Sequence, residues 1–178
     1  CTGHQVTVLD NFSNSSPKAI ERILRICKDD GLSEPPLTVV DGDICDQQKL
    51  KEVFSENSID AVIHFAGLKA IGESVEKPLD YYKNNVQGSI NLFQAMQKSG
   101  VYHLIFSSSA TVYGDPDSLP LSEKSPSKEP TNPYGRSKLM IEGILKDLAL
   151  SDKKWHIALL RYFNPVGAHP SGLIGEDP

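Results

Sequence analysis

The chain has 178 residues and a mass of 19.5 kDa, with 39% hydrophobic and 23% charged residues. These are the values of one ordinary globular domain, and they exclude a collagen-like, low-complexity or wholly disordered chain. The 18 basic and 23 acidic residues give a net charge of −5, and no Lys/Arg cluster offers the basic surface that nucleic acid or an anionic membrane requires. A small molecule is therefore the expected partner.

The two ends of the sequence are unusual, because it starts at Cys1 rather than Met and stops at Asp177-Pro178 without a closing element. We therefore expect a piece of a longer protein. The three cysteines form no CxxC pair, so neither a disulfide framework nor a zinc site is predicted, and a reduced, cytosolic location is expected. No apolar run approaches the roughly 18 residues that a membrane span needs, and no signal peptide is visible.

Short β-rich runs alternate with longer helical patterns along the first half of the chain. Residues 5–9 predict a strand, and a helix then begins at Ser16-Pro17 and ends at Gly31. Residues 37–40 predict a second strand, and Asp46 is a suitable N-cap for a short helix. The nearly continuous apolar run 61–65 is typical of a parallel strand that is buried on both faces.

The second half continues the alternation. Residues 78–98 predict a long helix that ends at Gly100, with an apolar face of Leu79, Tyr82, Val86, Ile90, Phe93 and Met96. A strand over 103–106 precedes a loop rich in Pro and Ser at 114–131. Asn132-Pro133 opens a helix that runs to about Leu150, and residues 156–160 predict the last strand before an irregular tail.

Five predicted strands with helix-containing connections imply βαβ units with right-handed crossovers. The predicted fold is therefore α/β, a doubly wound parallel sheet covered on both faces. Ligands of such sheets bind beyond the carboxyl ends of the strands. The residues at those ends are Asp10, Asp43, Ala66-Gly67, Ser107 to Ser109 and Tyr162 to Asn164.

Asp10 is a candidate for binding a dinucleotide, because the dinucleotide-binding version of this fold places a carboxylate after its second strand, where it binds the adenosine ribose. A carboxylate there would repel a 2′-phosphate, which favours NAD over NADP. The alternative is that Asp10-Asn11 is only a strand-ending turn, and Asp43 is either an adenine contact or a solvated turn.

No glycine fingerprint precedes Asp10, although G-x-G-x-x-G normally lies roughly 20 residues upstream of such an acid. Only nine residues stand before Asp10. We therefore expect an incomplete sheet whose first βα unit, with the glycine turn, is missing from this sequence.

The strongest catalytic signal is the pair Tyr134 and Lys138, which stand four residues apart and so project from one face of the predicted helix. A lysine ammonium near a phenol lowers the tyrosine pKa from about 10 toward neutrality and makes it a usable general base. A serine from Ser107 to Ser109 would hydrogen-bond the same substrate oxygen. Tyr-x-x-x-Lys alone is also typical of a helix surface, but its place after the strand that ends SSSATVYG favours catalysis.

Seven segments resemble one known family. They are Leu9-Asp10-Asn11, Asp43-Ile44, HFAGLKAIGESVEKP (64–78), YYKNNV (81–86), SSSATVYG (107–114), NPYGRSK (132–138) and LLRYFNPVGAHPSG (159–172). Through its whole length the chain is similar to the extended short-chain dehydrogenase/reductase family and, within it, to the UDP-glucose 4-epimerases. The resemblance implies a partial Rossmann-like, NAD-binding domain over residues 1–160 and the start of a substrate-binding region over residues 161–178.

The resemblance also implies roles for single residues. Tyr134 is the implied catalytic base, Lys138 lowers its pKa and binds the nicotinamide ribose, and Ser109 hydrogen-bonds the sugar 4-oxygen. The implied cofactor contacts are Asp10, Asn11, Ser13, Asn14, Ser15, Asp43, Ile44, Phe65, Ala66, Gly67, Lys69, Asn84, Ser109, Tyr134, Lys138 and Phe163. The implied substrate contacts are Ser109, Tyr134 and Asn164. Without the resemblance, Ile44, Phe65 and Phe163 would equally be core residues, and one of Asn84 and Asn85 is expected to be a solvated polar residue.

The implied reaction inverts C4 of a UDP-hexose through a 4-keto intermediate, with tightly held NAD, and interconverts UDP-glucose and UDP-galactose. The family also implies a homodimer that packs through the helices at about 78–98 and 133–150. None of the histidines has metal-ligand spacing, and His64 is expected to be a core residue.

Three alternatives remain open. Nucleotide-sugar 4,6-dehydratases resemble the chain but carry T-D-E where it has Ser109, Ala110 and Thr111, so the acid and base for water elimination are absent. A UDP-N-acetylglucosamine or UDP-glucuronate 4-epimerase would share the same motifs. A non-catalytic NAD-binding relative, or an inert fragment, is the third: without the glycine turn, these residues alone are expected to bind NAD weakly and turn over nothing.

Overall fold

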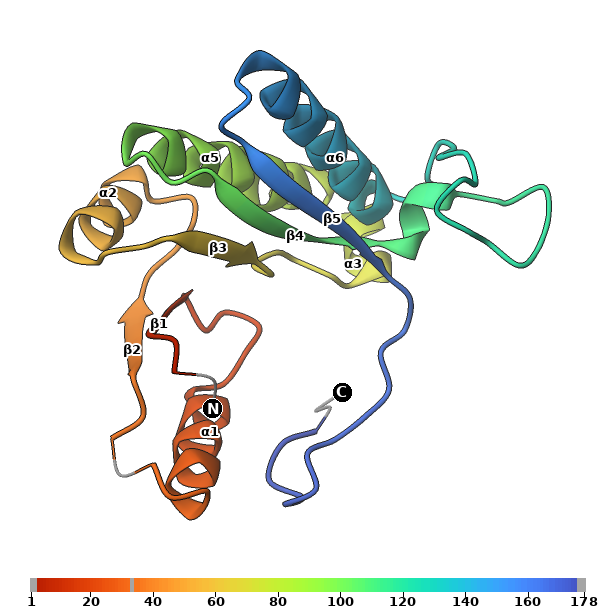
Figure 1. Ribbon diagram of the computed structural model, residues 1–178. Coiled ribbons are helices and arrows are strands. Elements are labelled where there is room, and N and C mark those ends of the chain that lie inside the picture. Colours follow the sequence, from red (N-terminus) through yellow and green to blue (C-terminus); the bar gives the residue numbers. More distant parts are fainter. Residues whose placement is uncertain (1–2, 33, 176–178) are drawn as a thin grey trace. The chain divides into compact units, whose positions relative to one another are not determined.

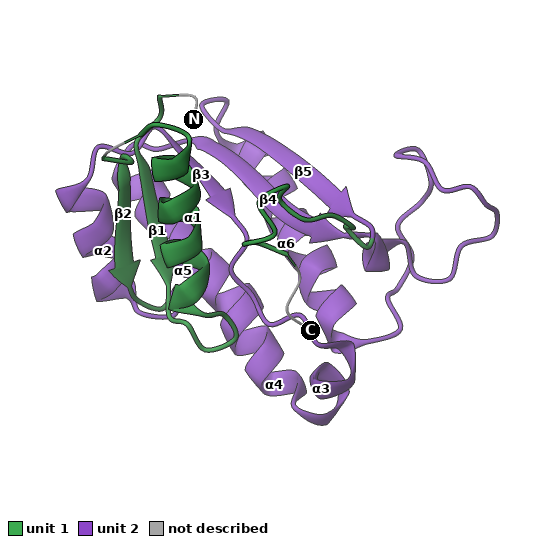
Figure 2. Cartoon of the chain, turned by 90° about the horizontal axis from the view of Figure 1, so that it is seen from below, with its two compact units in different colours: residues 1–43, 164–178 green, residues 44–163 purple. Residues whose placement is uncertain are grey.

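The computed structural model describes residues 3–32 and 34–175, which divide into two compact units (Figure 2). Unit 1 comprises residues 1–43 and 164–178, and unit 2 comprises residues 44–163. Within the described ranges, no helix is long and apolar enough to cross a bilayer.

Unit 1 is built from one βαβ unit. Strand β1 (Val6–Asp10) is followed by helix α1 (Pro17–Asp29) and strand β2 (Leu37–Asp41), and the two strands pair in parallel with Asp10 opposite Asp41. Helix α1 begins as predicted, with Pro17 in its first turn and the Ser16 hydroxyl accepting a hydrogen bond from the Lys18 amide at 3.3 Å.

Unit 2 contains the other strands and most of the helices. In chain order these are α2 (Gln47–Glu56), β3 (Ala61–His64), α3 (Ile71–Glu76), α4 (Pro78–Tyr81), the π-helical η1 (Tyr82–Gln87), α5 (Gly88–Lys98), β4 (His103–Ser109), the 3₁₀ turn η2 (Ala110–Tyr113), α6 (Pro133–Ser151) and β5 (His156–Tyr162). Strands β3, β4 and β5 form a parallel sheet in that order, with α5 and α6 on one side of it (Figure 1).

The α/β class and the parallel pairing are confirmed, but the five strands do not form one sheet. They form two ladders, β1-β2 and β3-β4-β5. The classic doubly wound sheet has six strands in the order 3-2-1-4-5-6. The ladder β1-β2 corresponds to its strands 2 and 3, and the ladder β3-β4-β5 corresponds to its strands 4, 5 and 6. That a first βα unit lies before Cys1 stays a prediction.

The expectation that β3 is buried on both faces is wrong. His64 is 2% exposed, whereas its neighbour Ile63 is 58% exposed. Strand β4 alternates in the same way, since Leu104 and Phe106 are buried while Ile105 keeps 37% of its surface exposed. Because α5 and α6 lie on the same side of this sheet (Figure 1), the apolar side chains on its other side stay accessible.

The long helix predicted at 78–98 forms, but its inward face differs from the prediction. The π-helical turn η1 interrupts it and adds a residue to one turn. The side chain buried before this turn is therefore Tyr81 rather than Tyr82, and Leu79 is 79% exposed. An inserted π turn leaves no clear mark on the apolar spacing, so the sequence pattern could not show it.

Candidate active site

Helix α6 places Tyr134 and Lys138 one turn apart at its N-terminal end. The Asn132 Oδ1 atom accepts a hydrogen bond from the Gly135 amide at 2.8 Å, and Pro133 occupies the first helical position, so the helix starts where the sequence predicted. The Lys138 Nζ atom lies 5.9 Å from the centre of the Tyr134 ring. The pair that the spacing singled out is therefore brought together.

Lys138 is a buried cation. Only 5% of the residue is exposed, and its Nζ atom donates a hydrogen bond to the Ser107 carbonyl at 2.9 Å and lies 5.0 Å from the centre of the Phe106 ring. Burial lowers the Lys138 pKa to about 8, so the ammonium remains the major form at neutral pH. A cation thus stands beside Tyr134 at the pH of the cell.

His64 in β3 is buried and neutral. Burial, helped by the charge of Lys138, lowers the His64 pKa to about 3. One ring nitrogen, Nε2, lies 2.8 Å from the Ser89 hydroxyl, and the ring contacts Phe93 and Phe106. The prediction of a satisfied core histidine is confirmed.

Ser109 ends β4 and is oriented by Thr111. Its hydroxyl oxygen accepts hydrogen bonds from the Thr111 amide at 3.2 Å and the Thr111 hydroxyl at 3.0 Å. Because both bonds are accepted, the Ser109 proton is left to donate to a ligand oxygen. Gly135 lets α6 approach this turn, since a Cβ there would lie 2.7 Å from the Cβ of Pro130 and 3.2 Å from the Thr111 hydroxyl oxygen.

Asn85, which the sequence interpretation did not select, holds the loop after β3 against α6. Its Oδ1 accepts from the Leu68 amide at 2.8 Å, and its Nδ2 donates to the Leu68 carbonyl at 3.0 Å and to the Ser137 hydroxyl at 3.1 Å. Asn85 is only 1% exposed and is therefore not a solvated residue, whereas Asn84 is half-buried. The π turn of η1 carries both side chains.

Gly67 stands where this loop passes Lys138. A Cβ at Gly67 would lie 3.2 Å from Asn85 Oδ1 and 3.7 Å from Lys138 Nζ. The absence of a side chain therefore lets this loop pack closely against Asn85 and the buried ammonium. Of the other candidates near this loop, Phe65, Ala66 and Lys69 are exposed.

The candidates in unit 1 form a cluster after β1. Asp10 is half-buried, and its Oδ1 accepts from the Phe12 amide at 2.8 Å and from the Ser15 hydroxyl at 2.9 Å. The Asn11 side chain donates to Asp43 Oδ2 at 2.9 Å. Ser13 and Asn14 belong to the same exposed loop, in which Phe12 has a left-handed φ of 51°. The structure therefore brings these predicted residues together at the carboxyl ends of β1 and β2.

The three apolar candidates, Ile44, Phe65 and Phe163, differ in how far they are exposed to solvent. Ile44 is a buried residue, and a Cβ at Gly88 would lie 2.7 Å from its Cδ1, so it packs on α5. Phe65 and Phe163 are 63% and 60% exposed, which disfavours the alternative that they are core residues. Asn164 is exposed in unit 1.

A second residue missed by the sequence interpretation is Glu142, which is fully buried in α6. It follows Lys138 by four residues, as Lys138 follows Tyr134, so all three share one face of the helix. That repeated spacing was visible in the sequence and could have singled out the acid.

Residues 2–176 match the NAD dependent epimerase/dehydratase family. The chain belongs to this family. Among curated proteins, it is 56% identical over 173 residues to the UDP-glucose 4-epimerase of Pasteurella multocida, covering 97% of this chain and 49% of that protein. It is 54% identical over 177 residues to the UDP-glucose 4-epimerase of Bacillus subtilis, covering 99% of this chain and 50% of that protein. The chain thus spans about half the length of these relatives.

Solved structures of the family have the same fold. The UDP-glucose 4-epimerase of Bifidobacterium longum, in complex with NAD+ and UDP, superimposes with a TM-score of 0.92 at 53% identity, covering 99% of this chain and 51% of that one. The UDP-Glc/GlcNAc 4-epimerase of Campylobacter jejuni gives a TM-score of 0.82 at 38% identity, covering 91% of this chain and 46% of that one. The Rossmann-like fold that the resemblance implied is confirmed.

Proposed function

We propose that this chain, at the length of its curated relatives, forms an NAD-dependent UDP-glucose 4-epimerase that interconverts UDP-glucose and UDP-galactose. One observation carries the proposal: α6 holds Tyr134 beside the buried ammonium of Lys138, next to the end of β4 that carries Ser109. The relatives that share 51% to 56% of its residues are named UDP-glucose 4-epimerases, which supports the proposed substrate.

The residues present fit NAD at both ends of the cofactor. Gly67 brings the backbone after β3 close to Lys138, whose ammonium is proposed to bind the nicotinamide ribose. Among the described residues, both hydrogen bonds that Asp10 accepts go to Oδ1, which leaves Oδ2 for the adenosine ribose hydroxyls. The remaining proposed contacts are Asn11, Ser13, Asn14, Ser15, Asp43, Ile44, Phe65, Ala66, Lys69, Asn84, Ser109, Tyr134 and Phe163.

The residues of unit 2 then supply the proton chemistry. Tyr134, as phenolate, accepts the proton of the sugar 4-hydroxyl and returns it to the 4-oxygen when C4 is reduced from the other face. The Lys138 ammonium stabilises the phenolate, and the Ser109 hydroxyl donates to the same 4-oxygen. When bound, NAD supplies the hydride acceptor and donor for C4. Asn164 is proposed to contact the diphosphate of the nucleotide sugar.

The test is a substrate panel with a polypeptide that contains this chain at the length of its relatives. We expect conversion of UDP-galactose to UDP-glucose in a coupled assay, with UDP-N-acetylgalactosamine and UDP-glucuronate as separate arms. Turnover of only the N-acetylated or uronate sugar would replace the proposed substrate with another nucleotide-sugar 4-epimerase substrate. A product that has lost water would contradict epimerisation, and no turnover in any arm would contradict the enzyme assignment.

Two further properties follow from the proposal. Residues 1–160 are proposed as part of an NAD-binding domain and residues 161–178 as the start of the substrate-binding region, so the 178 residues alone should bind NAD weakly and turn over nothing. Detectable UDP-galactose conversion by that isolated polypeptide would contradict this expectation. We also propose that the protein is a homodimer and that it is located in the cytosol. Light scattering of the active protein tests the dimer, for which we expect the mass of two chains.

A further inference from the structure

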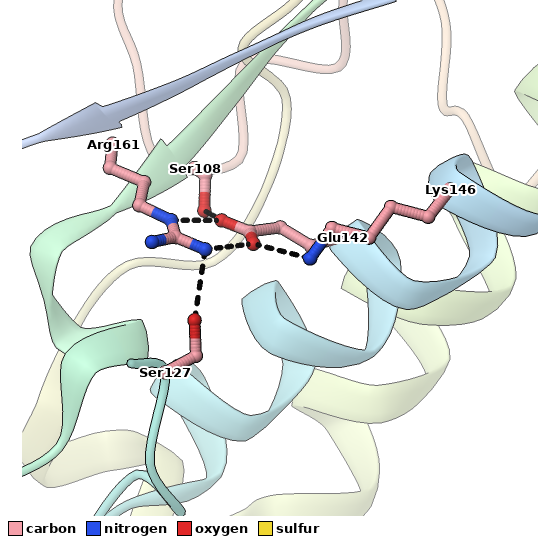
Figure 3. A network of polar contacts seen from close by, with 5 residues as sticks. All are labelled: Ser108, Ser127, Glu142, Lys146 and Arg161. Carbon is pink, nitrogen blue, oxygen red and sulfur yellow. Dashed lines mark hydrogen bonds and ion pairs between the residues drawn. The ribbon is translucent and has the colours of Figure 1, made fainter. Parts of the chain in front are cut away.

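A buried carboxylate links the segments that carry the proposed catalytic residues (Figure 3). Glu142 in α6 is 0% exposed and accepts three hydrogen bonds. Its Oε1 atom accepts from the Ser108 hydroxyl at 2.6 Å and from Arg161 Nε at 2.9 Å, and its Oε2 atom accepts from Arg161 Nη2 at 2.7 Å. From the solvent side, Lys146 Nζ reaches Oε2 at 3.8 Å. We call Ser108, Glu142 and Arg161 the carboxylate network.

The carboxylate network contains one negative charge, on Glu142, and one positive charge, on Arg161. Burial by itself raises the pKa of the Glu142 carboxyl, but the hydrogen bonds from Arg161 and Ser108 and the charge of Arg161 outweigh it and hold that pKa below its usual value. The hydrogen bonds with Glu142 raise the pKa of Arg161. Glu142 is therefore ionised in the folded protein, and its negative charge is held in place from two strands.

The network fixes α6 on the end of β4 at consecutive residues. Lys138 donates to the Ser107 carbonyl, and Glu142, one turn further along the helix, accepts from the Ser108 hydroxyl. Ser109, the next residue, carries the hydroxyl that is proposed to meet the substrate. A slide of the helix along the strand would break both bonds, so the network sets where Tyr134 stands relative to Ser109.

Arg161 extends the network to the neighbouring segments. Its guanidinium carbon lies 4.7 Å from the centre of the Tyr113 ring in η2, and its Nη2 atom donates to the Ser127 hydroxyl at 2.9 Å in the loop between η2 and α6. Arg161 also stands in β5 only two residues before Phe163, a proposed cofactor contact. One ion pair thus joins α6 and β5, and through its further contacts it reaches β4, η2 and the loop before α6.

Stability alone is a weak explanation for such a pair. Removing two charges from water offsets much of their attraction, and apolar replacements of buried ion pairs are often neutral or stabilising. Directional, two-point hydrogen bonds do specify geometry, however. We propose that Glu142, with Ser108 and Arg161, is a positioning residue that holds Tyr134 and Lys138 in register with Ser109. This inference rests on the proposed epimerase function.

The main test compares Glu142→Gln with Lys146→Met, which removes the solvent-side partner of the same carboxylate; the lysine side chain is 58% exposed. Glu142→Gln is expected to lower kcat by about tenfold to a hundredfold, because small misplacements of catalytic groups have effects of this size. KM for the UDP-sugar should stay within about twofold, since the network contacts no proposed substrate group. Lys146→Met should leave both constants unchanged.

A second readout does not depend on turnover. The tyrosinate ultraviolet absorbance that Tyr134 contributes, obtained by subtracting the Tyr134→Phe spectrum in each background, should fall in Glu142→Gln at a fixed pH just below the Lys138 pKa of about 8, where Lys138 is still an ammonium. Loss of a nearby negative charge alone would favour the phenolate and raise that signal. A fall therefore reports that Tyr134 has moved away from the Lys138 ammonium, which a merely structural role would not produce in folded protein.

A milder variant covers the case in which Glu142→Gln does not fold. Ser108→Ala keeps the ion pair with Arg161 and removes only the hydroxyl at 2.6 Å, and it is expected to give a smaller fall in both kcat and tyrosinate signal. Unchanged kcat and unchanged tyrosinate signal in a folded network variant of an active protein would overturn the inference. If the parent protein turns over no UDP-sugar, the proposed function fails instead, and the tyrosinate comparison still decides whether the network positions Tyr134.

Discussion

The two clusters proposed to bind the two ends of the cofactor are held in opposite ways. In unit 2, Lys138 and Glu142 are almost fully buried, and each is fixed by bonds to residues more than 30 positions away in β4. In unit 1, Asp10 is half-buried and is held by Phe12 and Ser15, which lie two and five residues along the chain. One cluster is part of the core, and the other is a local loop.

This difference suggests a division of labour. Charges held inside a core keep their positions during a reaction, which is what proton transfer at a defined atom requires. A carboxylate in an exposed loop contributes binding energy with little effect on the rest of the fold. Substitutions in unit 2 should therefore change both chemistry and stability, and substitutions in the Asp10 loop should change cofactor affinity alone.

The largest expected stability effect is the pH dependence that Lys138 contributes. Burial lowers its pKa from 10.5 to about 8, so between these values the unfolded chain binds more protons than the folded one. The free energy of unfolding of the parent protein should therefore rise relative to Lys138→Met, by about 2 kcal/mol from about pH 8 to about pH 10. Urea unfolding at the two pH values measures this, with Lys146→Met expected to follow the parent. A constant difference between Lys138→Met and the parent would contradict the buried cation.

A smaller effect is expected for the close contact at Gly135. In Gly135→Ala the new Cβ would lie 2.7 Å from the Cβ of Pro130, so we expect a loss of about 1–3 kcal/mol in the free energy of unfolding. Gly143→Ala is the matched control on α6, because no described atom beyond its neighbours and its own helix backbone lies within 4 Å of that Cβ. The free energy of unfolding of Gly143→Ala should rise by about 0.5–1 kcal/mol, because alanine favours the helix over glycine. Thermal unfolding of both variants distinguishes them, and equal shifts would contradict the tight approach of α6 to Thr111.

The smallest effect on the fold is expected at Asp10. Asp10→Asn should change the free energy of unfolding by about 0.5 kcal/mol or less, as for other surface substitutions. It should weaken NAD binding about tenfold, the value of a lost charge-assisted hydrogen bond, and narrow the preference for NAD over NADP. Titration calorimetry with both cofactors measures this, with Asp41→Asn on the paired strand as the control. Unchanged NAD affinity would remove Asp10 from the proposed site.

Local signals in the sequence were enough for much of the fold and for the catalytic pair. Asp46 and Asn132 both accept the N-cap hydrogen bonds expected of them. Tyr134 and Lys138 could be paired in advance because four residues along a helix bring side chains to one face. Each of these features depends on neighbours in the chain.

The residues that were missed depend on distant partners instead. Asn85 acts through Ser137, 52 residues away, and Glu142 through Ser108, 34 residues away. The four-residue spacing from Lys138 places Glu142 on the same face of α6, but neither the burial of these polar residues nor their distant partners can be read from the sequence. The exposed face of the β3-β4-β5 sheet was missed for a related reason, since apolar residues on both sides of a strand do not say which elements cover them.

The central claim is that Tyr134 is the base for the sugar 4-hydroxyl, and Tyr134→Phe tests it most directly in the parent protein. We expect UDP-galactose turnover to fall by about a hundredfold or more, the usual contribution of a general base. Bound NAD, measured after denaturing the purified protein, should stay at the parent level because Lys138 and Gly67 are untouched. Turnover close to that of the parent would contradict the assignment of Tyr134 as the catalytic base.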